Sequence, residues 1–381
     1  MVIKFLHGEI LYLTYTKKDT MNSLEHFKAS FKFEKTDRLP IHTFGGWVET
    51  YDRWLKEGLP ENWRESNYFK EDEVQGTGIH LGTNGYSPFF PRFEKKIISE
   101  DDDIVIYEDE HGRKVKQRKA ERNISIAEYL EFPVKSRVDW DRMKQRMDPD
   151  VEVRYSTLRK HPSTSKRTYP VVQVMSGTFR VLWHLFGDVN MAYVFYDDPE
   201  LVHDIMRQWL KMNTEAIDRI MPDTDFNVLN IMEDMSCNTG MMVSPEFFRE
   251  FMMPYYKELI SHVRKHPSVF GIWVDSDGDV SGLIPLLLEC GVDGLFPFEV
   301  QAGMDVTKIR EQYGKRLVIR GGIDKRELAK GKDAIDRELE RVLPVFLKTG
   351  GYFICLDHQA PPDISLENYQ YFLDSARSFK K

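Results

Sequence analysis

The stretch VFGIWVDSDGDVSGLIPLLLECGVDGLFPFEV, residues 269–300, predicts the fold of this chain of 381 residues. It opens with an apolar run of strand length at Val269–Val274, continues with a helical stretch at Val280–Cys290, and reaches a second short apolar run at Gly294–Phe296. Continuous apolar strands separated by amphipathic helices are typical of a parallel sheet covered by helices on its outer face. Acidic residues follow both strands directly.

The same alternation runs through the chain from residue 170 onward. Apolar runs of strand length lie at Val171–Val174, Phe226–Ile231, Val269–Val274, Gly294–Phe296, Leu317–Ile319 and Tyr352–Leu356. Helical spacing follows them at Phe179–Phe186, Pro199–Ile220, Pro245–His266, Val280–Cys290, Val306–Tyr313, Lys332–Leu347 and Leu366–Phe379. These six units, a strand at Ile41–Phe44 and one further strand expected near residues 79–106 make eight, which predicts a (β/α)8 (TIM) barrel. The alternative is an open doubly wound sheet, but no G-x-G-x-x-G follows the first strand.

The N-terminal third adds two features to the barrel. Short alternating segments around the turn at Glu110–Arg113 predict a β-hairpin insertion at about 89–119. Residues 1–20 are interpreted as an N-terminal extension, because Met21 and the cap residue Asn22 look like a more natural start. The barrel domain is therefore expected to span residues 21–381.

Composition excludes several classes of function. The chain has 53 basic and 61 acidic residues, a formal net charge of −8, and no long basic run, so no nucleic-acid partner is expected. Three cysteines cannot form a disulfide framework, which favours a reducing, cytoplasmic compartment. No apolar run approaches the roughly 18 residues of a membrane helix, so no membrane partner is expected.

Polar residues follow the predicted strands at their carboxyl ends, where a barrel of this kind carries its active site. Five of the six strands from residue 170 onward contribute such residues: Glu233 and Asp234, Asp275 to Asp279, Glu299, Arg320, and Asp357 with His358. Several carboxylates and one histidine thus meet at one mouth in this prediction.

Several stretches carry a resemblance to a known superfamily. They are DRLP at 37–40, SGTFRVLWHLFG at 176–187, DDPELVHDIM at 197–206, SPEFFREFMMPYYKELI at 244–260, GLIPLLLECGVDGLFPFEVQAGMD at 282–305, RGGIDKREL at 320–328 and GGYF with PPDISLENYQYF within 350–372. In these stretches the chain resembles the uroporphyrinogen decarboxylase/cobalamin-independent methionine synthase superfamily, over essentially residues 22–380. The resemblance implies a (β/α)8 barrel, as the strand pattern does.

Two branches of the superfamily bear on the function. Uroporphyrinogen decarboxylases have an arginine-rich signature soon after the first strand, whereas residues 42–58 here read HTFGGWVETYDRWLKEG. The C-terminal third is more similar to the corrinoid-dependent methyltransferases, which bind zinc through a His-x-Cys pair and a later Cys. Asp275 stands at the position of that histidine, Asp277 at that of the first cysteine, and His358 at that of the later one.

The resemblance therefore implies a metal site made of Asp275, Asp277 and His358. Without thiolates this set is rich in oxygen; it suits zinc with an open position, and manganese or another divalent ion is an alternative. Glu233, Asp275 and His358 are the predicted catalytic residues. The predicted substrate-binding residues are Arg180, Phe298, Glu299 and Arg320.

We predict from this resemblance a methyltransferase that moves a methyl group from a small substrate to a corrinoid. No D-x-H-x-x-G cobalamin signature occurs in the chain, so the corrinoid is expected on a separate partner protein. An oxygen-rich metal site is a stronger Lewis acid than a thiolate-ligated one and suits an O-methyl donor such as a methoxylated aromatic compound. A homodimer is one possible assembly.

Two other functions remain open. One is a carboxy-lyase of the uroporphyrinogen decarboxylase type that uses carboxylates with Arg180 or Arg320. The other is a barrel that binds a small molecule without chemistry. The residues also have plain structural alternatives, since Asp-x-Asp often forms a self-capping turn and a histidine before Gln-Ala-Pro-Pro can stabilise a loop.

Overall fold

The computed structural model of the protein describes residues 4–6, 9–11, 21–83, 85–119 and 127–380. Most of the expected N-terminal extension, residues 1–20, lies outside the described residues. Its described part is a short hairpin, in which β1 (Lys4–Leu6) pairs with β2 (Glu9–Leu11) in antiparallel register.

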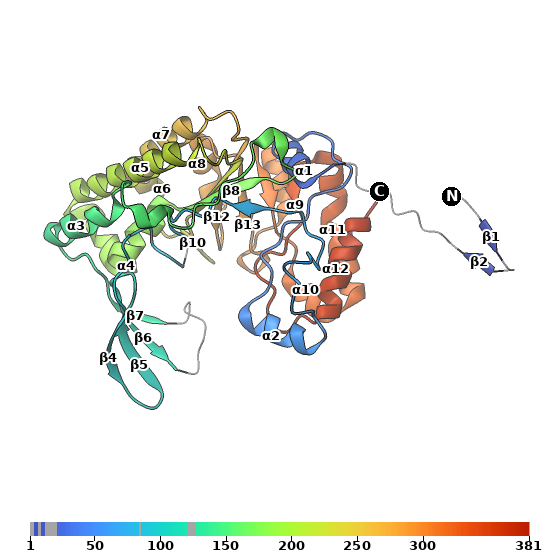
Figure 1. The fold of residues 1–381 in the computed structure, drawn as a ribbon, viewed down its shortest axis with the longest axis horizontal. Helices are drawn as coiled ribbons and strands as arrows, with labels where there is room; N and C mark the ends of the chain where they lie inside the picture. The colour runs from blue at the N-terminus through green and yellow to red at the C-terminus, as the bar shows by residue number, and fades with distance from the viewer. Residues whose placement is uncertain (1–3, 7–8, 12–20, 84, 120–126, 381) are drawn as a thin grey trace.

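A parallel sheet of seven strands forms the centre of the molecule (Figure 1). Its order is β15-β14-β13-β12-β9-β8-β3, so each strand lies beside its neighbour in the chain. The strands are β3 (Gln75–Gly76), β8 (Val171–Ser176), β9 (Val228–Met232), β12 (Gly271–Ser276), β13 (Gly294–Pro297), β14 (Val318–Arg320) and β15 (Tyr352–Phe353).

Ile41 joins the two edges of this sheet. It forms a parallel bridge with Ile354, directly after β15. On its other side the Ile41 carbonyl accepts a hydrogen bond from the backbone N–H of Asp72 at 2.9 Å, just before β3. The segment around Ile41 therefore completes the eight strands, and we call it the first strand because it comes first in the chain among the barrel strands. The structure confirms the (β/α)8 barrel.

The second strand lies at Gln75–Gly76, just before the stretch near which it was expected, and within that stretch Leu81 makes a single bridge to Met175. The sequence did not give its position because the strand is two residues long and polar. Its neighbour Thr77 donates a side-chain hydrogen bond to Gln173 of β8, so polar contacts replace the apolar run on which the prediction relied.

Helix α1 (Ser23–Phe31) precedes the barrel strands, and most of the other helices follow the strands and cover the outside of the sheet. The other helices are α2 (Val48–Lys56), α3 (Arg137–Lys144), α4 (Thr178–Asp197), α5 (Pro199–Ile220), α6 (Pro245–Phe247), α7 (Met253–Val263), α8 (Leu283–Cys290), α9 (Val306–Tyr313), α10 (Lys325–Lys330), α11 (Lys332–Thr349) and α12 (Leu366–Ser378). Their ends follow local chemistry. Asn22 forms a capping box with Glu25 before α1, and Ser365 caps α12.

Two helices differ most from their predicted extents. α4 continues eleven residues beyond Phe186, through a kink at Gly187 with φ 67°, where a Cβ would lie 2.1 Å from the ring of Phe132. The helix predicted at 245–266 is interrupted by a π-helical turn at 248–252, where Met253 N–H donates to the Phe248 carbonyl. Pro254 follows directly and has no N–H to continue the regular pattern.

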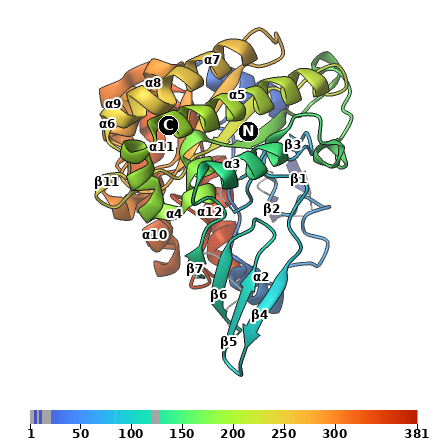
Figure 2. The ribbon, with the colours of Figure 1, turned by 90° about the vertical axis from the view of Figure 1, so that its left-hand side faces the viewer.

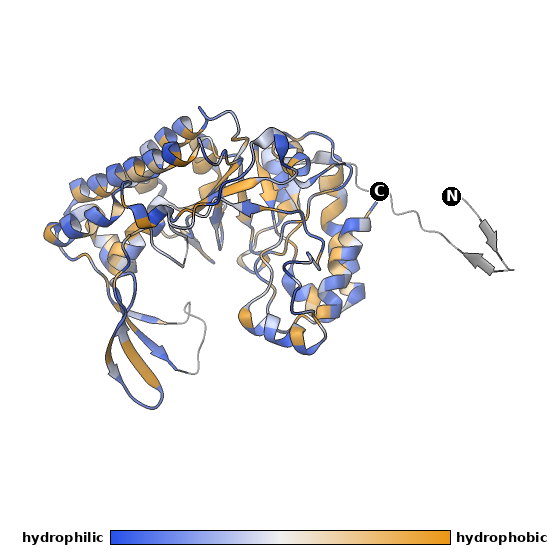
Figure 3. Ribbon diagram, in the orientation of Figure 1, coloured by the Kyte–Doolittle hydropathy of each residue, from blue (hydrophilic) through white to orange (hydrophobic). Residues whose placement is uncertain are grey.

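The apolar core has two layers, and Figure 3 shows hydrophobic residues along the central strands and the inner faces of the helices. The larger layer lies between strands and helices. The smaller one fills the barrel interior, where Phe27 and Phe31 of α1 contact Trp273 and Phe353 through ring centroids 4.7–6.3 Å apart. Helix α1 thus supplies aromatic rings to the interior of the barrel, below the mouth.

A four-stranded antiparallel sheet projects from the barrel (Figures 1 and 2). Its strands are β4 (Lys96–Glu100), β5 (Ile104–Glu108), β6 (Lys114–Arg118) and β7 (Glu128–Glu131), whereas the sequence suggested a hairpin at about 89–119. The buried Arg113 joins this sheet to α4, since its guanidinium lies 3.3 Å from His184 Nδ1 and 5.5 Å from the ring centre of Trp183. Among the residues that the structure describes, no helix combines the length and the apolar character needed to cross a membrane.

Candidate active site

Three metal-ligating side chains meet at the carboxyl end of the barrel. They are Asp277 after β12, Glu299 after β13, and His358 after β15. One donor atom from each lies within 4.8 Å of the others, and His358 Nε2 is 3.5 Å from Asp277 Oδ2. We call these three residues the mouth cluster.

Two backbone-linked contacts hold the cluster in place. Glu299 Oε2 accepts a hydrogen bond from the backbone N–H of Gly278 at 3.0 Å, which ties the β13 loop to the β12 loop. Asp357 accepts from the backbone of Val300 and of Lys325, each at 3.1 Å. The loops that carry Glu299 and His358 are therefore joined through the buried carboxylate next to His358.

The electrostatics of the mouth reflect an excess of negative charge. Burial raises the pKa of Glu299, and the charge of Asp277 raises it further. Burial and the same Asp277 charge raise the pKa of Asp234, which faces the cluster. Burial alone would lower the pKa of His358, but its hydrogen bond to Asp277 and the charges of Asp277 and Glu299 raise it. A cation at this place would relieve the repulsion between these carboxylates.

Asp275 lies deeper than the mouth cluster. It is 6% exposed, and its charge acts on the buried guanidinium of Arg320. The sequence placed Asp275 with Asp277 and His358, whereas the group of donors that the structure brings together contains Glu299 in its place. The reason is the position of Asp275 in the strand. It still belongs to β12 and lies on the same face as Trp273, which points into the barrel, whereas Asp277 follows the end of the strand.

Arg320 holds the end of the first strand. Its guanidinium donates to the carbonyls of His42 and Thr43 at 2.9 and 3.1 Å, and its centre lies 4.1 Å from the ring centre of Phe44. Burial lowers its pKa. Arg320 is 4% exposed and its guanidinium is bound to backbone carbonyls. It therefore supports the wall of the mouth, whereas the sequence predicted that it binds the substrate.

Glu233 faces away from the mouth. Its fully buried carboxylate accepts hydrogen bonds from Thr178 N–H at 2.8 Å, Thr178 Oγ1 at 2.7 Å and Arg180 N–H at 3.1 Å, and from the hydroxyl of Tyr256. These donors include the first backbone N–H groups of α4, which otherwise have no partner within the helix. The structure thus gives Glu233, predicted as catalytic, the position of an anchor for the start of α4.

The sequence placed the next residue, Asp234, at the mouth but gave it no role in the site. Its backbone has φ 52°, and its carboxylate lies 3.6 Å from the guanidinium of Arg180, a predicted substrate-binding residue. That guanidinium also lies 4.3 Å from the ring centre of Trp183. The signal that could have found Asp234 is the two-residue period of strand β9, which puts neighbouring side chains on opposite faces.

The aromatic wall beside His358 comes from the first strand. Phe44 and Trp47 each have a ring centroid 6.5 Å from that of His358. The sequence named Phe298 for such a role, but Phe298 is 1% exposed, has φ 62° and packs in the outer apolar layer. Phe44 and Trp47 were overlooked because they lie more than 300 residues from His358 in the chain.

Phe44 also lines a cavity of about 660 Å³ between the first strand and β3. Tyr51 and Trp63 contribute stacked rings to its lining, with centroids 4.7 Å apart, and the Arg64 guanidinium lies 4.6 Å from the Trp63 ring centre. Glu71 lines the cavity as well and binds the backbone N–H and hydroxyl of Thr43.

Comparison with known proteins gives the family. The model of the family described as uroporphyrinogen decarboxylase (URO-D) matches residues 103–379, which is most of the chain. The chain belongs to the uroporphyrinogen decarboxylase family. Similar curated proteins are the uroporphyrinogen decarboxylases of Vesicomyosocius okutanii, 21% identical over 49% of this chain and 52% of that protein, and of Chlorobium phaeobacteroides, 22% identical over 63% and 69%.

A similar solved structure is a methyltransferase from Methanosarcina mazei. It has a TM-score of 0.56 and 15% sequence identity, and the match covers 93% of this chain and 98% of that one. At this identity the likeness concerns the fold, which agrees with the barrel described above.

The segment after the first strand is poor in arginine. Residues 42–58 contain a single arginine, Arg53. Its side chain binds Glu57 Oε1 at 2.6 Å and the Pro362 carbonyl at 2.8 Å, on the surface of the molecule. This segment therefore offers the mouth no cluster of guanidinium groups for a substrate with many carboxylates.

Proposed function

We propose that the protein is a corrinoid-dependent methyltransferase that takes a methyl group from a small O-methyl compound. The observation that carries this proposal is the mouth cluster, with Asp277, Glu299 and His358 offering donor atoms within 4.8 Å of one another. In this proposal the corrinoid is carried by a separate protein.

The donor set fits a divalent ion. Two carboxylates and one imidazole supply two negative charges, and three protein ligands leave a position open for a substrate atom. Burial, and after it the charge of Asp277, raises the pKa of Glu299 and of Asp234, and a cation at the cluster would offset the Asp277 charge. A bound zinc or similar ion would supply a Lewis acid that polarises the ether oxygen of the methyl donor.

The residues of the chain would then bind and orient the substrate. Phe44 and Trp47 lie beside His358 and would contact an aromatic ring by its face or edge. Arg180, paired with Asp234, would hold a carboxylate or hydroxyl group of the substrate at the opposite side of the mouth. Arg320 supports Phe44 from below and keeps this wall in place.

The assay mixes the enzyme with a reduced corrinoid protein and a panel of methyl donors, and follows the loss of Co(I) absorbance. We expect methyl transfer from a methoxylated aromatic compound, and loss of transfer in Asp277→Ala and His358→Ala with unchanged circular dichroism. The matched control is Asp279→Ala, an aspartate of the same loop outside the mouth cluster. Transfer to or from thiols alone would contradict the Lewis-acid argument.

The second candidate is a carboxy-lyase of the uroporphyrinogen decarboxylase type. It is supported by the family and by the names of the curated relatives. Arg180 would bind a substrate carboxylate, and Lys325, whose Nζ lies 3.3 Å from Asp357, would add positive charge near the mouth. Release of carbon dioxide from a carboxylated substrate, without methyl transfer from any donor, would favour this function.

A further inference from the structure

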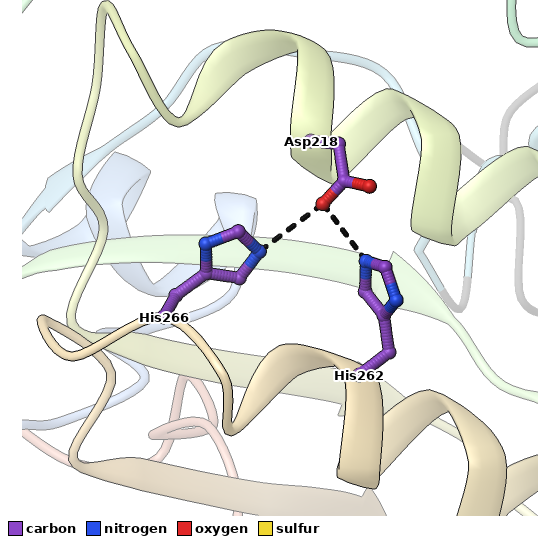
Figure 4. Close-up of side chains that lie close together, drawn as sticks. All are labelled: Asp218, His262 and His266. Atoms are coloured by element: carbon purple, nitrogen blue, oxygen red, sulfur yellow. Dashed lines mark hydrogen bonds and ion pairs between the residues drawn. The ribbon is translucent and has the colours of Figure 1, made fainter.

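A second cluster of metal-ligating side chains lies far from the mouth, on the outer helices (Figure 4). His262 is in the last turn of α7, and His266 follows one turn later. Both point toward Asp218 of α5, and the Nε2 atoms lie 2.8 Å and 3.2 Å from the same oxygen, Asp218 Oδ1. We propose that Asp218, His262 and His266 form a binding site for a divalent transition-metal ion such as Zn²⁺.

The spacing of the donor atoms fits such an ion. Tetrahedral zinc with bonds of about 2.0–2.1 Å to nitrogen and oxygen requires ligand atoms about 3.3 Å apart. The two observed nitrogen–oxygen separations lie close to that value, and the three donor atoms lie within 4.8 Å of one another. The nitrogens can therefore reach the geometry of a metal site through small side-chain rotations.

The chemistry of the three ligands selects the kind of ion. Imidazole nitrogens suit zinc, copper, nickel and iron, whereas magnesium and calcium prefer a shell of oxygens. His266 lies beyond the end of α7, and the turn after the helix brings its Nε2 to the same Asp218 oxygen that His262 contacts. The side chains of His262, His266 and Asp218 are 25%, 22% and 51% exposed, which lets an ion enter from solvent and leaves room for water as the fourth ligand.

The position of the site indicates a structural role. α5 leads into the start of β9, and α7 leads into the start of β12, and these two strands are neighbours in the barrel. Asp218 and His262 lie in the last turns of their helices, so the ion would sit at the end of the barrel opposite the mouth. Residues at that end of a (β/α)8 barrel serve stability, while those at the mouth serve catalysis. A metal ion here would clamp α5 to α7.

The test must separate this site from the mouth cluster. We therefore use the full chain with Asp277→Ala and His358→Ala as the background, which removes two of the three mouth donors. After treatment with a chelator, Zn²⁺ is titrated by calorimetry, and Co²⁺ is used as a spectroscopic probe of tetrahedral nitrogen and oxygen ligation. The test variants add His262→Ala with His266→Ala, or Asp218→Asn, and the matched control adds His161→Ala, another partly exposed histidine outside the cluster.

We expect one Zn²⁺ per chain in the background and in the His161→Ala control. Removal of both histidines should weaken binding by no less than the roughly 10–100-fold that loss of an outer-shell partner costs at metal sites. Zn²⁺ should also raise the midpoint of thermal unfolding only where the three ligands are present, because a ligand of the folded state stabilises that state. Equal Zn²⁺ affinity with and without the histidines, or absence of binding in the background, would overturn the proposal. Methyl-transfer activity plays no part in this test, so its outcome is independent of the proposed function.

Discussion

Replacement of Asp72 by asparagine should destabilise the barrel at the point where its first strand closes the sheet. Asp72 has a fully buried carboxylate that accepts a hydrogen bond from Ile41 N–H at 2.8 Å. The same carboxylate binds the Arg38 guanidinium at 2.7 and 3.1 Å and His26 Nδ1 at 2.9 Å. Asparagine keeps the shape of the side chain but removes the charge that these two cationic partners require.

The size of the effect follows from the pKa of Asp72. Burial raises this pKa, but the hydrogen bonds and charges of His26 and Arg38 outweigh burial and lower it from 3.8 to about 2. Such a shift corresponds to about 2.5 kcal/mol of stability for the ionised carboxylate. Because the pKa is lower in the folded state, this stability is present above the unfolded-state pKa and is lost as the pH falls through the folded-state pKa. At pH 3 about half of it remains.

His26 sets the upper limit of the pH range in which its interaction with Asp72 is at full strength. Burial lowers its pKa, but the hydrogen bonds to Asp72 and Asp37 outweigh burial and raise it above 6.5. Its contribution is therefore complete below the unfolded-state pKa and disappears as the pH rises through the raised folded-state value. At pH 5.5 His26 is protonated and Asp72 is ionised, so the interaction is at full strength.

The measurement is urea unfolding followed by tryptophan fluorescence and circular dichroism at pH 5.5 and pH 3. For Asp72→Asn we expect a loss of about 2.5 kcal/mol in the free energy of unfolding at pH 5.5 and about half of that at pH 3. Glu73→Gln is the matched control, because Glu73 is the exposed neighbour, and its effect should stay within about 0.5 kcal/mol. A loss that is equal at both pH values, or no larger than that of the control, would refute the reasoning.

Three further predictions concern the site and the N-terminus. Glu299→Gln should lose bound divalent ion in elemental analysis while Asp275→Asn keeps it, and the opposite result would return Asp275 to the metal site that the sequence suggested. Glu233→Ala should lower the free energy of unfolding by about 3 kcal/mol or more, because four donors lose their acceptor, with unchanged metal content. Deletion of residues 2–20 should leave urea unfolding unchanged, since the described hairpin β1–β2 pairs only within itself; a lost cooperative transition would contradict this.

The sequence predicted the barrel because its strands and helices differ sharply in apolar pattern. Among the barrel strands, β8, β12 and β13 are buried on both faces and appear as continuous apolar runs, so their number and order could be read directly. The second strand could not, because β3 is only two residues long and Thr77 beside it makes polar contacts. The closure at Ile41 depends on the Asp72 carboxylate, a long-range contact without a sequence pattern.

The candidate site was predicted in outline because parallel strands bring their carboxyl ends together. Asp277, His358 and Glu299 come together at the mouth as strand-end residues should, although Glu299 was given another role. Phe44 and Trp47 could not be assigned, because their contact with His358 joins the two ends of the chain. Contacts of this kind depend on barrel closure, which a linear pattern does not contain.

The choice between Glu233 and Asp234 depended on which face of β9 looks inward. Val228 belongs to the interior layer and Leu229 and Ile231 to the outer one. Extending this alternation past the end of β9 at Met232 assigns Glu233 to the outer side and Asp234 to the inner side.

Both faces of a barrel strand are apolar, so hydrophobicity alone does not separate the two series. Isolated polar residues could have separated the two faces. Asn230 in β9, Asp275 in β12 and Arg320 in β14 each lie two residues after a residue of the barrel interior, and so on the inward face. Gln173 in β8 lies on the outward series, where Thr77 binds it. In three of these four strands the isolated polar residue faces inward, which would have favoured Asp234 over Glu233 as the residue at the mouth. The inward face of such a barrel is therefore best inferred from several strands together.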